Sequence, residues 1–160
     1  MVVAPADPYI FKAAIDGAAQ LGVPVACVDT DSPASSRLFF IGTSNREAGE
    51  AGGELLAKAL NGGGDVILLT VPGQWNLAQR VLGYQDVLKN YPAVKVVDIL
   101  DDAGDPGRAS TRVSEALRKH PGLKGIGALD AAGGPGVAEA VKKEGRQPMI
   151  VAMDMDPPTL

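Results

Sequence analysis

The stretch DVILLTVPGQWNLAQRVLG, Asp65–Gly83, decides the predicted fold of this 160-residue chain. Its four consecutive apolar residues, Val66–Leu69, are typical of a strand that is buried on both faces of a parallel sheet. A turn containing Pro and Gly follows, and then a helical pattern that carries Gln79 and Arg80. A buried strand that leads through a loop into a helix indicates an open α/β sheet, in which ligands bind at the carboxyl ends of the strands.

The same alternation of strand and helix patterns continues in both directions along the chain. Short strands are expected at 2–4, 23–28, 38–41, 66–70, 94–100, 125–129 and 149–153. Helices are expected at 10–21, 46–60, 75–90, 106–120 and 135–144. This order predicts a three-layer, doubly wound parallel sheet of the flavodoxin or Rossmann-like kind, with right-handed crossovers.

The predicted domain boundary lies near residues 42–46. Residues 1–43 hold two strand-helix units, and residues 44–160 hold a nearly complete α/β unit of four strands. The two glycine-rich runs, Gly62–Gly64 and Gly133–Gly136, are interpreted as turns. They are not phosphate-binding loops, because the chain contains no GxxxxGK[ST] motif.

Composition excludes several classes of function. Hydrophobic residues make up 46% of the chain and aromatic residues only 4%, so the core is expected to be aliphatic. The net charge of −4 argues against a nucleic-acid surface. The single cysteine, Cys27, excludes an internal disulfide and is expected to be buried, and the single histidine, His120, is expected at a helix end. No cofactor motif and no nucleophile with a neighbouring base is apparent, so no catalytic residue is predicted.

Acidic residues recur after the expected strands. Because parallel strands point the same way, the residues that follow them share one edge of a sheet. These residues are Asp29 and Asp31, the loop Gln74–Arg80, Asp101 and Asp102, Asp130, and Asp154 and Asp156. Any single Asp could serve only as a helix cap, but the recurrence favours a polar ligand site.

The predicted ligand is neutral and rich in hydroxyl groups. Carboxylates accept hydrogen bonds from hydroxyls, and the fork of an arginine donates to them. The alternative is a hard cation such as Mg²⁺, which is less favoured because the carboxylates lie on separate strands with Arg80 among them. Trp75 either packs at a helix start or stacks on the apolar side of the ligand.

An ordered set of short segments resembles the ribose-binding-protein-like branch of periplasmic sugar-binding proteins, the type I solute receptors of ABC importers. The segments are APADP at 4–8, GVPV at 22–25, VDTD at 28–31, GTSN at 42–45, RVLGY at 80–84, HPGLKGI at 120–126 and VAMD at 151–154. The resemblance implies the type I periplasmic-binding-protein fold, with two lobes that close over a monosaccharide or a related polyol, and no catalysis.

The resemblance also implies roles for individual residues. Asp29 would bind sugar hydroxyls from the N-terminal lobe, while Arg80, Asp130 and Asp154 would bind from the C-terminal lobe. Asp130 lies where many relatives have an Asn followed by Asp, which is a departure that bears on the identity of the ligand. Trp75 and Asn76 match less firmly. No metal and no cofactor is implied.

The extent of the resemblance implies that the chain is a fragment, incomplete at both ends. Residues 1–43 would be a remnant of the N-terminal lobe, and residues 44–160 most of the C-terminal lobe. The intact protein would be periplasmic or otherwise extracytoplasmic and would deliver its sugar to a membrane permease. Residues 1–160 alone are expected to bind sugar weakly or not at all, and to associate through exposed strands.

Two alternatives remain at this point. The effector-binding domain of a lactose-repressor-type transcription regulator shares this fold, and its helix-turn-helix would lie upstream. An enzyme of doubly wound fold is the other alternative. Sequence upstream of residue 1 would separate receptor from regulator, and a search for turnover would test for an enzyme.

Overall fold

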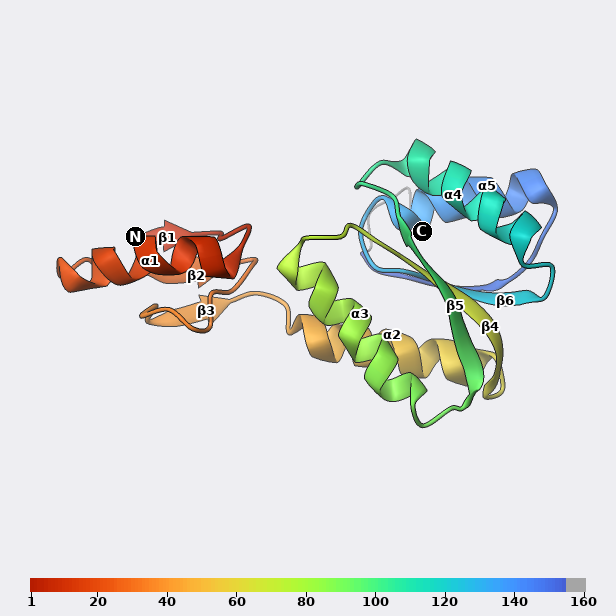
Figure 1. The fold of residues 1–160 in the computed structure, drawn as a ribbon, viewed down its shortest axis with the longest axis horizontal. Coiled ribbons are helices and arrows are strands. Elements are labelled where there is room, and N and C mark those ends of the chain that lie inside the picture. Colours follow the sequence, from red (N-terminus) through yellow and green to blue (C-terminus); the bar gives the residue numbers. More distant parts are fainter. Residues whose placement is uncertain (155–160) are drawn as a thin grey trace. The chain divides into compact units, whose positions relative to one another are not determined.

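The computed structural model describes residues 1–154 as two compact units of alternating strands and helices (Figure 1). The first unit contains Met1–Ser44 together with the short segment Gly73–Asn76. The second unit contains Asn45–Pro72 and the residues from Leu77 onward. Every strand pairs in parallel with its neighbours, which confirms the predicted α/β class.

The first unit is a small three-stranded sheet with one helix. Its elements are β1 (Val2–Val3), α1 (Pro8–Gln20), β2 (Ala26–Val28) and β3 (Phe39–Ile41), and the strand order is β1-β2-β3. Asp7 caps α1 by accepting hydrogen bonds from the backbone N–H groups of Tyr9 and Ile10. Ile15, Val25 and Cys27 form the core, so the prediction that Cys27 is buried is confirmed.

The second unit is a four-stranded sheet covered by helices on both faces (Figure 1). Its strand order is β5-β4-β6-β7. The helices α2 and α3 lie on one face and α4 and α5 on the other, which is the predicted three-layer arrangement. The elements are α2 (Asn45–Ala59), β4 (Gly63–Thr70), α3 (Trp75–Leu88), β5 (Ala93–Asp101), α4 (Pro106–Lys119), β6 (Leu123–Ala128), α5 (Gly133–Glu144) and β7 (Met149–Ala152).

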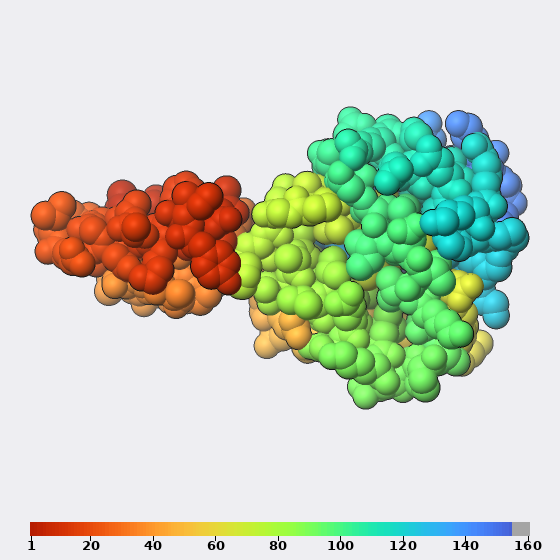
Figure 2. All heavy atoms as spheres, in the orientation of Figure 1, coloured from red at the N-terminus to blue at the C-terminus, as the bar shows by residue number. Residues whose placement is uncertain are grey.

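The central strand β4 divides the core of the second unit into two clusters. Successive side chains of a strand point to opposite faces. Ile67 and Leu69 therefore pack with residues of α4 and α5, whereas Val66 and Leu68 pack with residues of α2 and α3. All four side chains are fully buried, as the apolar run predicts. Figure 2 shows the atoms of α3, β5 and α4 on one face of the second unit.

Glycines allow the helices on each face to approach each other closely. A Cβ built at Gly49 of α2 would overlap the backbone of Arg80 in α3, and one at Gly83 of α3 would overlap the backbone of Arg46 in α2. On the other face, a Cβ at Gly136 of α5 would overlap Ala109 of α4. Close approach without side-chain overlap is the reason for glycine at these positions.

The prediction of turns for two glycine runs was right for Gly62 but wrong for the rest of both runs. Gly133–Gly136 forms the first turn of α5, because this part of the helix must approach α4. Gly63 and Gly64 are paired in β4 with Ala93 and Val94, so the strand begins earlier than the apolar run indicated. Neither the close approach of α5 to α4 nor the pairing of Gly63 and Gly64 with β5 leaves a signal in the local sequence.

Several helices begin or end where the sequence signals predict. Asp105 caps α4 by accepting a hydrogen bond from the Arg108 N–H, with Pro106 in the first turn, and His120 is the C-cap. Gly22 follows the end of α1 with a φ of 75°, which suits glycine. No helix between residues 1 and 154 is long and apolar enough to cross a membrane.

Candidate ligand-binding site

The carboxyl ends of the strands in the second unit form one edge of the sheet. In the parallel register, Leu69 of β4 pairs with Leu100 of β5 and with Ala128 of β6. Ala128 pairs in turn with Ala152 of β7. The acidic residues that follow β5, β6 and β7 therefore leave the sheet along the same edge, as the sequence predicts.

Arg80 reaches this edge from the first half of α3. Its Nε donates a hydrogen bond of 2.8 Å to Oδ1 of Asn45 at the start of α2. Its Nη1 donates a hydrogen bond of 2.5 Å to the carbonyl oxygen of Leu129. A guanidinium carries five N–H donors, so these two bonds orient the group without using all of its donors. The structure thus brings Arg80 next to the backbone that carries Asp130.

Asn45 has a role that sequence reasoning missed. The run GTSN at 42–45 predicts only a capping cluster for α2. In the fold, the Asn45 side chain also accepts the Arg80 hydrogen bond across the interface between α2 and α3. A polar residue at a helix start gives no local sign of a partner 35 positions away.

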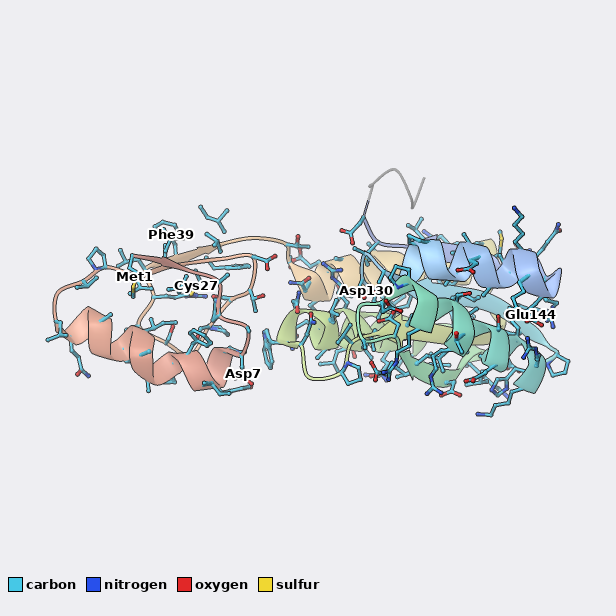
Figure 3. All side chains as sticks on the ribbon, turned by 90° about the horizontal axis from the view of Figure 1, so that it is seen from above. Met1, Asp7, Cys27, Phe39, Asp130 and Glu144 are labelled. Carbon is cyan, nitrogen blue, oxygen red and sulfur yellow. The ribbon has the colours of Figure 1, made fainter. Side chains whose placement is uncertain are left out.

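Asp130 lies between the end of β6 and the start of α5, where Figure 3 labels it. Its side chain is 9% exposed. Oδ1 accepts a hydrogen bond of 3.0 Å from the backbone N–H of Gly133, the first residue of α5. This hydrogen bond orients the Asp130 carboxylate at the start of the helix.

Asp102 follows β5 and is completely buried. Its Oδ1 accepts a hydrogen bond of 3.0 Å from the Gly104 N–H. Burial raises the pKa of the Asp102 carboxyl to about 6, the Gly104 N–H opposes this shift, and the neighbouring Asp130 adds to it. Sequence reasoning placed Asp102 on this edge of the sheet but gave it no role, because burial of a carboxyl cannot be read from its position after a strand.

Asp154 follows β7 at the same edge and is exposed. The Met153 N–H donates a hydrogen bond of 3.0 Å to the Ala128 carbonyl, which continues the pairing of β6 and β7 up to this point. Asp154 has a φ of 73°, a left-handed conformation that Asp tolerates better than most residues. The remaining acidic residue of the predicted set, Asp156, lies outside the described residues.

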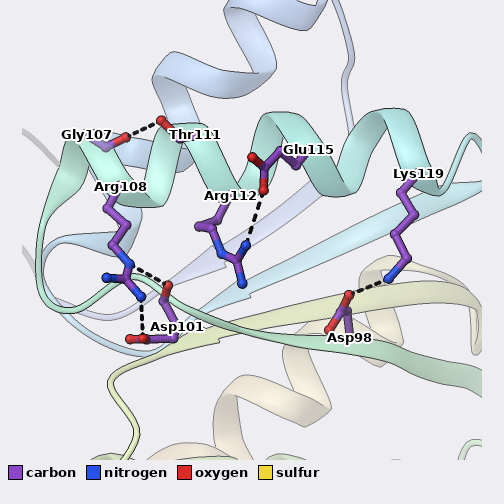
Figure 4. A network of polar contacts seen from close by, with 8 residues as sticks. All are labelled: Asp98, Asp101, Gly107, Arg108, Thr111, Arg112, Glu115 and Lys119. Atoms are coloured by element: carbon purple, nitrogen blue, oxygen red, sulfur yellow. Dashed lines mark hydrogen bonds and ion pairs between the residues drawn. The ribbon is translucent and has the colours of Figure 1, made fainter.

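Asp101 is part of a surface network that ties α4 to β5 (Figure 4). Arg108 of α4 donates from Nη2 to the Asp101 carboxylate at 2.5 Å and from Nε to its backbone carbonyl at 3.2 Å. Farther along the same helix, Lys119 pairs with Asp98 at 3.1 Å. The carboxylates of Asp101 and Asp98 thus both have ion-pair partners within the fold.

The other predicted site residues lie in the first unit. Asp29 and Asn76 line one cavity of about 290 Å³, together with Ala4, Ala6, Thr30 and Gln74. Asp29 is exposed and has a φ of 64°. Asp31, by contrast, forms a two-pronged ion pair with Arg37.

Trp75 is half-buried and contacts another ring of the first unit. Its ring meets that of Tyr9 at a centroid distance of 5.5 Å and an angle of 89°, an edge-to-face contact. The predicted set therefore divides between the units, with Asp29, Trp75 and Asn76 in the first and Arg80, Asp130 and Asp154 in the second. Among the described residues, no group of three or more His, Cys, Asp or Glu side chains could hold a metal ion.

Solved structures of sugar-binding proteins are similar to this chain over nearly its whole length. A sugar-binding protein of a sugar ABC transporter from Bacillus halodurans has 32% identity and a TM-score of 0.91, with 99% of this chain and 55% of that chain covered. An ABC transporter solute-binding protein from Burkholderia graminis, solved with D-arabinose, has 35% identity and a TM-score of 0.92, with 99% and 57% covered. An arabinose-binding protein from Geobacillus stearothermophilus has 29% identity and a TM-score of 0.85, with 99% and 55% covered.

This chain thus spans a little over half the length of the structures it matches. The comparison with curated proteins gives no significant match. The family model described as "Periplasmic binding protein domain" matches residues 1–160. On the strength of that match and of the parallel α/β units, the chain belongs to the periplasmic binding protein domain family.

Proposed function

We propose that this chain is part of a solute receptor that binds a monosaccharide, or a related polyol, for an ABC-type importer. The observation that carries the proposal is the placement of Arg80, which Asn45 and the Leu129 carbonyl hold beside Asp130. The similar structures from three organisms are all solute-binding proteins, two of them named for or solved with arabinose. This favours a receptor over a transcription regulator.

The side chains at the edge of the second sheet suit a ring of hydroxyl groups. A carboxylate accepts hydrogen bonds from two adjacent hydroxyls, and a guanidinium donates to hydroxyl or ring oxygens. Asp130 and Asp154 would supply the acceptors and Arg80 the donors. Hydrogen bonds to charged groups contribute about 1.5–3 kcal/mol each, so a few of them provide most of the affinity for a small polar ligand.

The first unit would supply the opposing side of the site. We assign residues 1–43 to the N-terminal lobe of the receptor and residues 44–160 to its C-terminal lobe. Asp29 and Asn76, which line the cavity of the first unit, would contact the sugar from that lobe. Trp75 would cover an apolar face of the sugar. Closure of two lobes by a hinge motion would enclose the ligand.

The intact receptor would act outside the cytoplasm and deliver its ligand to a membrane permease. It would catalyse no reaction, since binding and release of an unchanged sugar are all that delivery requires. Family membership and the transporter descriptions of the similar structures support this role.

The test uses the full-length protein and a panel of aldopentoses and aldohexoses, screened by thermal shift and then measured by calorimetry. Arg80→Ala is expected to weaken the tightest sugar by roughly 100-fold, since it removes charged hydrogen bonds of about 1.5–3 kcal/mol each. Arg112→Ala is the matched control, because Arg112 forms an exposed ion pair with Glu115 on the surface of α4. Absence of any sugar binding, or unchanged affinity in Arg80→Ala, would contradict the proposal.

A further inference from the structure

The cavity of the first unit has a lining that the proposed function uses only in part. Its volume is about 290 Å³, and its lining residues belong to the first unit. They are Ala4, Ala6, Asp29, Thr30, Gln74 and Asn76. The proposed function assigns a ligand contact to Asp29 and Asn76. Gln74 adds a second side-chain amide, which offers both a hydrogen-bond donor and an acceptor to this cavity.

Hydrogen bonds within the fold use some polar side chains of the first unit and leave others free. Asp31, close to the cavity in sequence, is bound by Arg37 through both carboxylate oxygens. Within residues 1–154, by contrast, the side chains of Asp29, Gln74 and Asn76 make no hydrogen bond to another group of the protein. These three side chains therefore retain their hydrogen-bonding groups for a ligand.

The backbone at Asp29 is strained where this residue lines the cavity. The Thr30 N–H donates a hydrogen bond of 2.7 Å to the Val28 carbonyl, two residues back. Asp29, between them, has a φ of 64°. A three-residue turn with a positive φ at its centre is the rare and strained form of the γ-turn. Strain of this kind persists where surrounding structure holds it and is found at ligand sites, so the turn supports a ligand-binding role for the cavity.

A glycine turn and a ring contact fix the backbone on either side of Gln74. Gly73 has a φ of 88°, and among the described residues no atom beyond its chain neighbours lies within 4 Å of a Cβ built there. Glycine is therefore needed for the conformation of the turn and not for space. Trp75, which follows Gln74 and begins α3, contacts the Tyr9 ring of α1 edge to face. Gln74 is thus held at the cavity before a ligand binds.

We propose that Gln74 binds the ligand and determines specificity, by exchanging hydrogen bonds with two adjacent hydroxyl groups. This inference rests on the proposed function, in which the ligand is a monosaccharide or a related polyol. The amide carbonyl accepts from one hydroxyl and the amide NH₂ group donates to the other, whereas the Asp29 carboxylate only accepts. A site that hydrogen-bonds a hydroxyl discriminates against an analogue without it, because the polar group of the site is left unpaired. Gln74 therefore selects sugars that carry both hydroxyl groups.

The test measures affinity by calorimetry, with the full-length protein, the sugar that gives the largest thermal shift and each of its monodeoxy analogues. In the wild-type protein, removal of a hydroxyl that contacts Gln74 is expected to weaken binding roughly tenfold, the value of one to two neutral hydrogen bonds. Gln74→Ala is expected to weaken the parent sugar by a similar factor. The same variant should bind that deoxy analogue as tightly as the parent sugar, since the group that distinguished them is gone.

Two further variants separate a ligand contact from an effect on folding. Gln74→Glu keeps the length of the side chain and its acceptor but has no N–H donor, so it is expected to lose discrimination at one of the two hydroxyls and to keep it at the other. Gln20→Ala is the matched control, because Gln20 is an exposed glutamine at the end of α1 away from Ala6. It should keep the wild-type affinities. An equal loss for the parent sugar and every analogue in Gln74→Ala would overturn the inference.

The outcomes also distinguish the role of Gln74 from the function on which it rests. If the wild-type protein binds no sugar, the proposed function is wrong and the role of Gln74 is wrong with it. If sugars bind and Arg80→Ala weakens them, while Gln74→Ala keeps the wild-type affinity for the parent sugar and every analogue, the receptor function stands and the role of Gln74 is wrong.

Discussion

The carboxyl of Asp102 makes the stability of the second unit depend on pH. Burial raises its pKa in the folded state to about 6, from a usual value near 3.8. The folded state therefore binds more protons than the unfolded state between these values, and stability falls as pH rises from about 4 through 6. This difference of about two units between the folded and unfolded pKa corresponds to roughly 3 kcal/mol of unfolding free energy. Asp102→Asn is expected to remove this loss and to be the more stable variant at pH 8, as measured by urea unfolding across a pH series.

Asp98, on the strand β5 that precedes Asp102, gives the opposite dependence of stability on pH and serves as the control. The hydrogen bond from Lys119 lowers the pKa of Asp98, so its contribution is present above the usual aspartate pKa and is lost as pH falls. Asp98→Asn should therefore leave unchanged the fall in stability that occurs as pH rises from about 4 to 6. A wild-type protein whose stability does not fall over that range would contradict the raised pKa of Asp102.

The hydrogen bond from Arg80 to Asn45 is expected to contribute to sugar affinity, because it orients the guanidinium. Asn45→Ala removes the acceptor of Nε, so the guanidinium retains only its bond to the Leu129 carbonyl. In the full-length receptor, we expect about a fivefold loss of sugar affinity, the value of one ordinary hydrogen bond of about 1 kcal/mol. Thr111→Ala, which removes a hydrogen bond to the Gly107 carbonyl within α4, is the comparison variant, and an equal loss in both would argue against positioning of Arg80 by Asn45.

At the scale of elements, the close contact of α2 and α3 depends on Gly49 and Gly83. Gly83→Val is expected to destabilise the second unit by about 3 kcal/mol or more, because its side chain would overlap backbone atoms of α2 that cannot move aside. Gly107→Val is the comparison, because the nearest atom to a Cβ there is a side-chain oxygen of Asp105 at 3.2 Å, and it should cost much less. Thermal or urea unfolding measures both.

The edge strands of the first unit support a prediction about association. Within the described residues, β1 and β3 are the outer strands of the three-stranded sheet, and Val2, Phe39 and Ile41 are 67%, 51% and 65% exposed. Open edges with large apolar side chains are templates for pairing with another chain. We expect residues 1–160 to self-associate at high concentration, and Ile41→Lys to reduce association more than Leu55→Lys on α2. Light scattering that reports a monomer at all concentrations would contradict this.

At the scale of the whole molecule, the proposed site requires both units and more chain than the 160 residues. The residues assigned to it are divided between the units, and the similar structures are nearly twice as long as this chain. We therefore expect these residues alone to bind sugars weakly or not at all, with millimolar affinity at best. Calorimetry that finds micromolar binding to the 160-residue chain would contradict this expectation, while the full-length protein serves as the positive control.

Local signals in the sequence predicted the order of strands and helices, the buried strand Val66–Leu69 and the cap at Asp105. They also predicted that Arg80, Asp130 and Asp154 would leave the sheet at one edge. These features depend on periodicity, on turn residues and on the common direction of parallel strands, all of which operate over a few neighbouring residues.

Only the tertiary structure decided which polar residues act on one another. The hydrogen bond from Arg80 to Asn45 and the complete burial of Asp102 depend on residues that are distant in sequence, and neither leaves a local pattern. The helical conformation of Gly133–Gly136 likewise depends on the approach of α5 to α4. Burial and long-range contact determine the charge of a carboxyl and the space beside a glycine, and both arise only when the elements pack together.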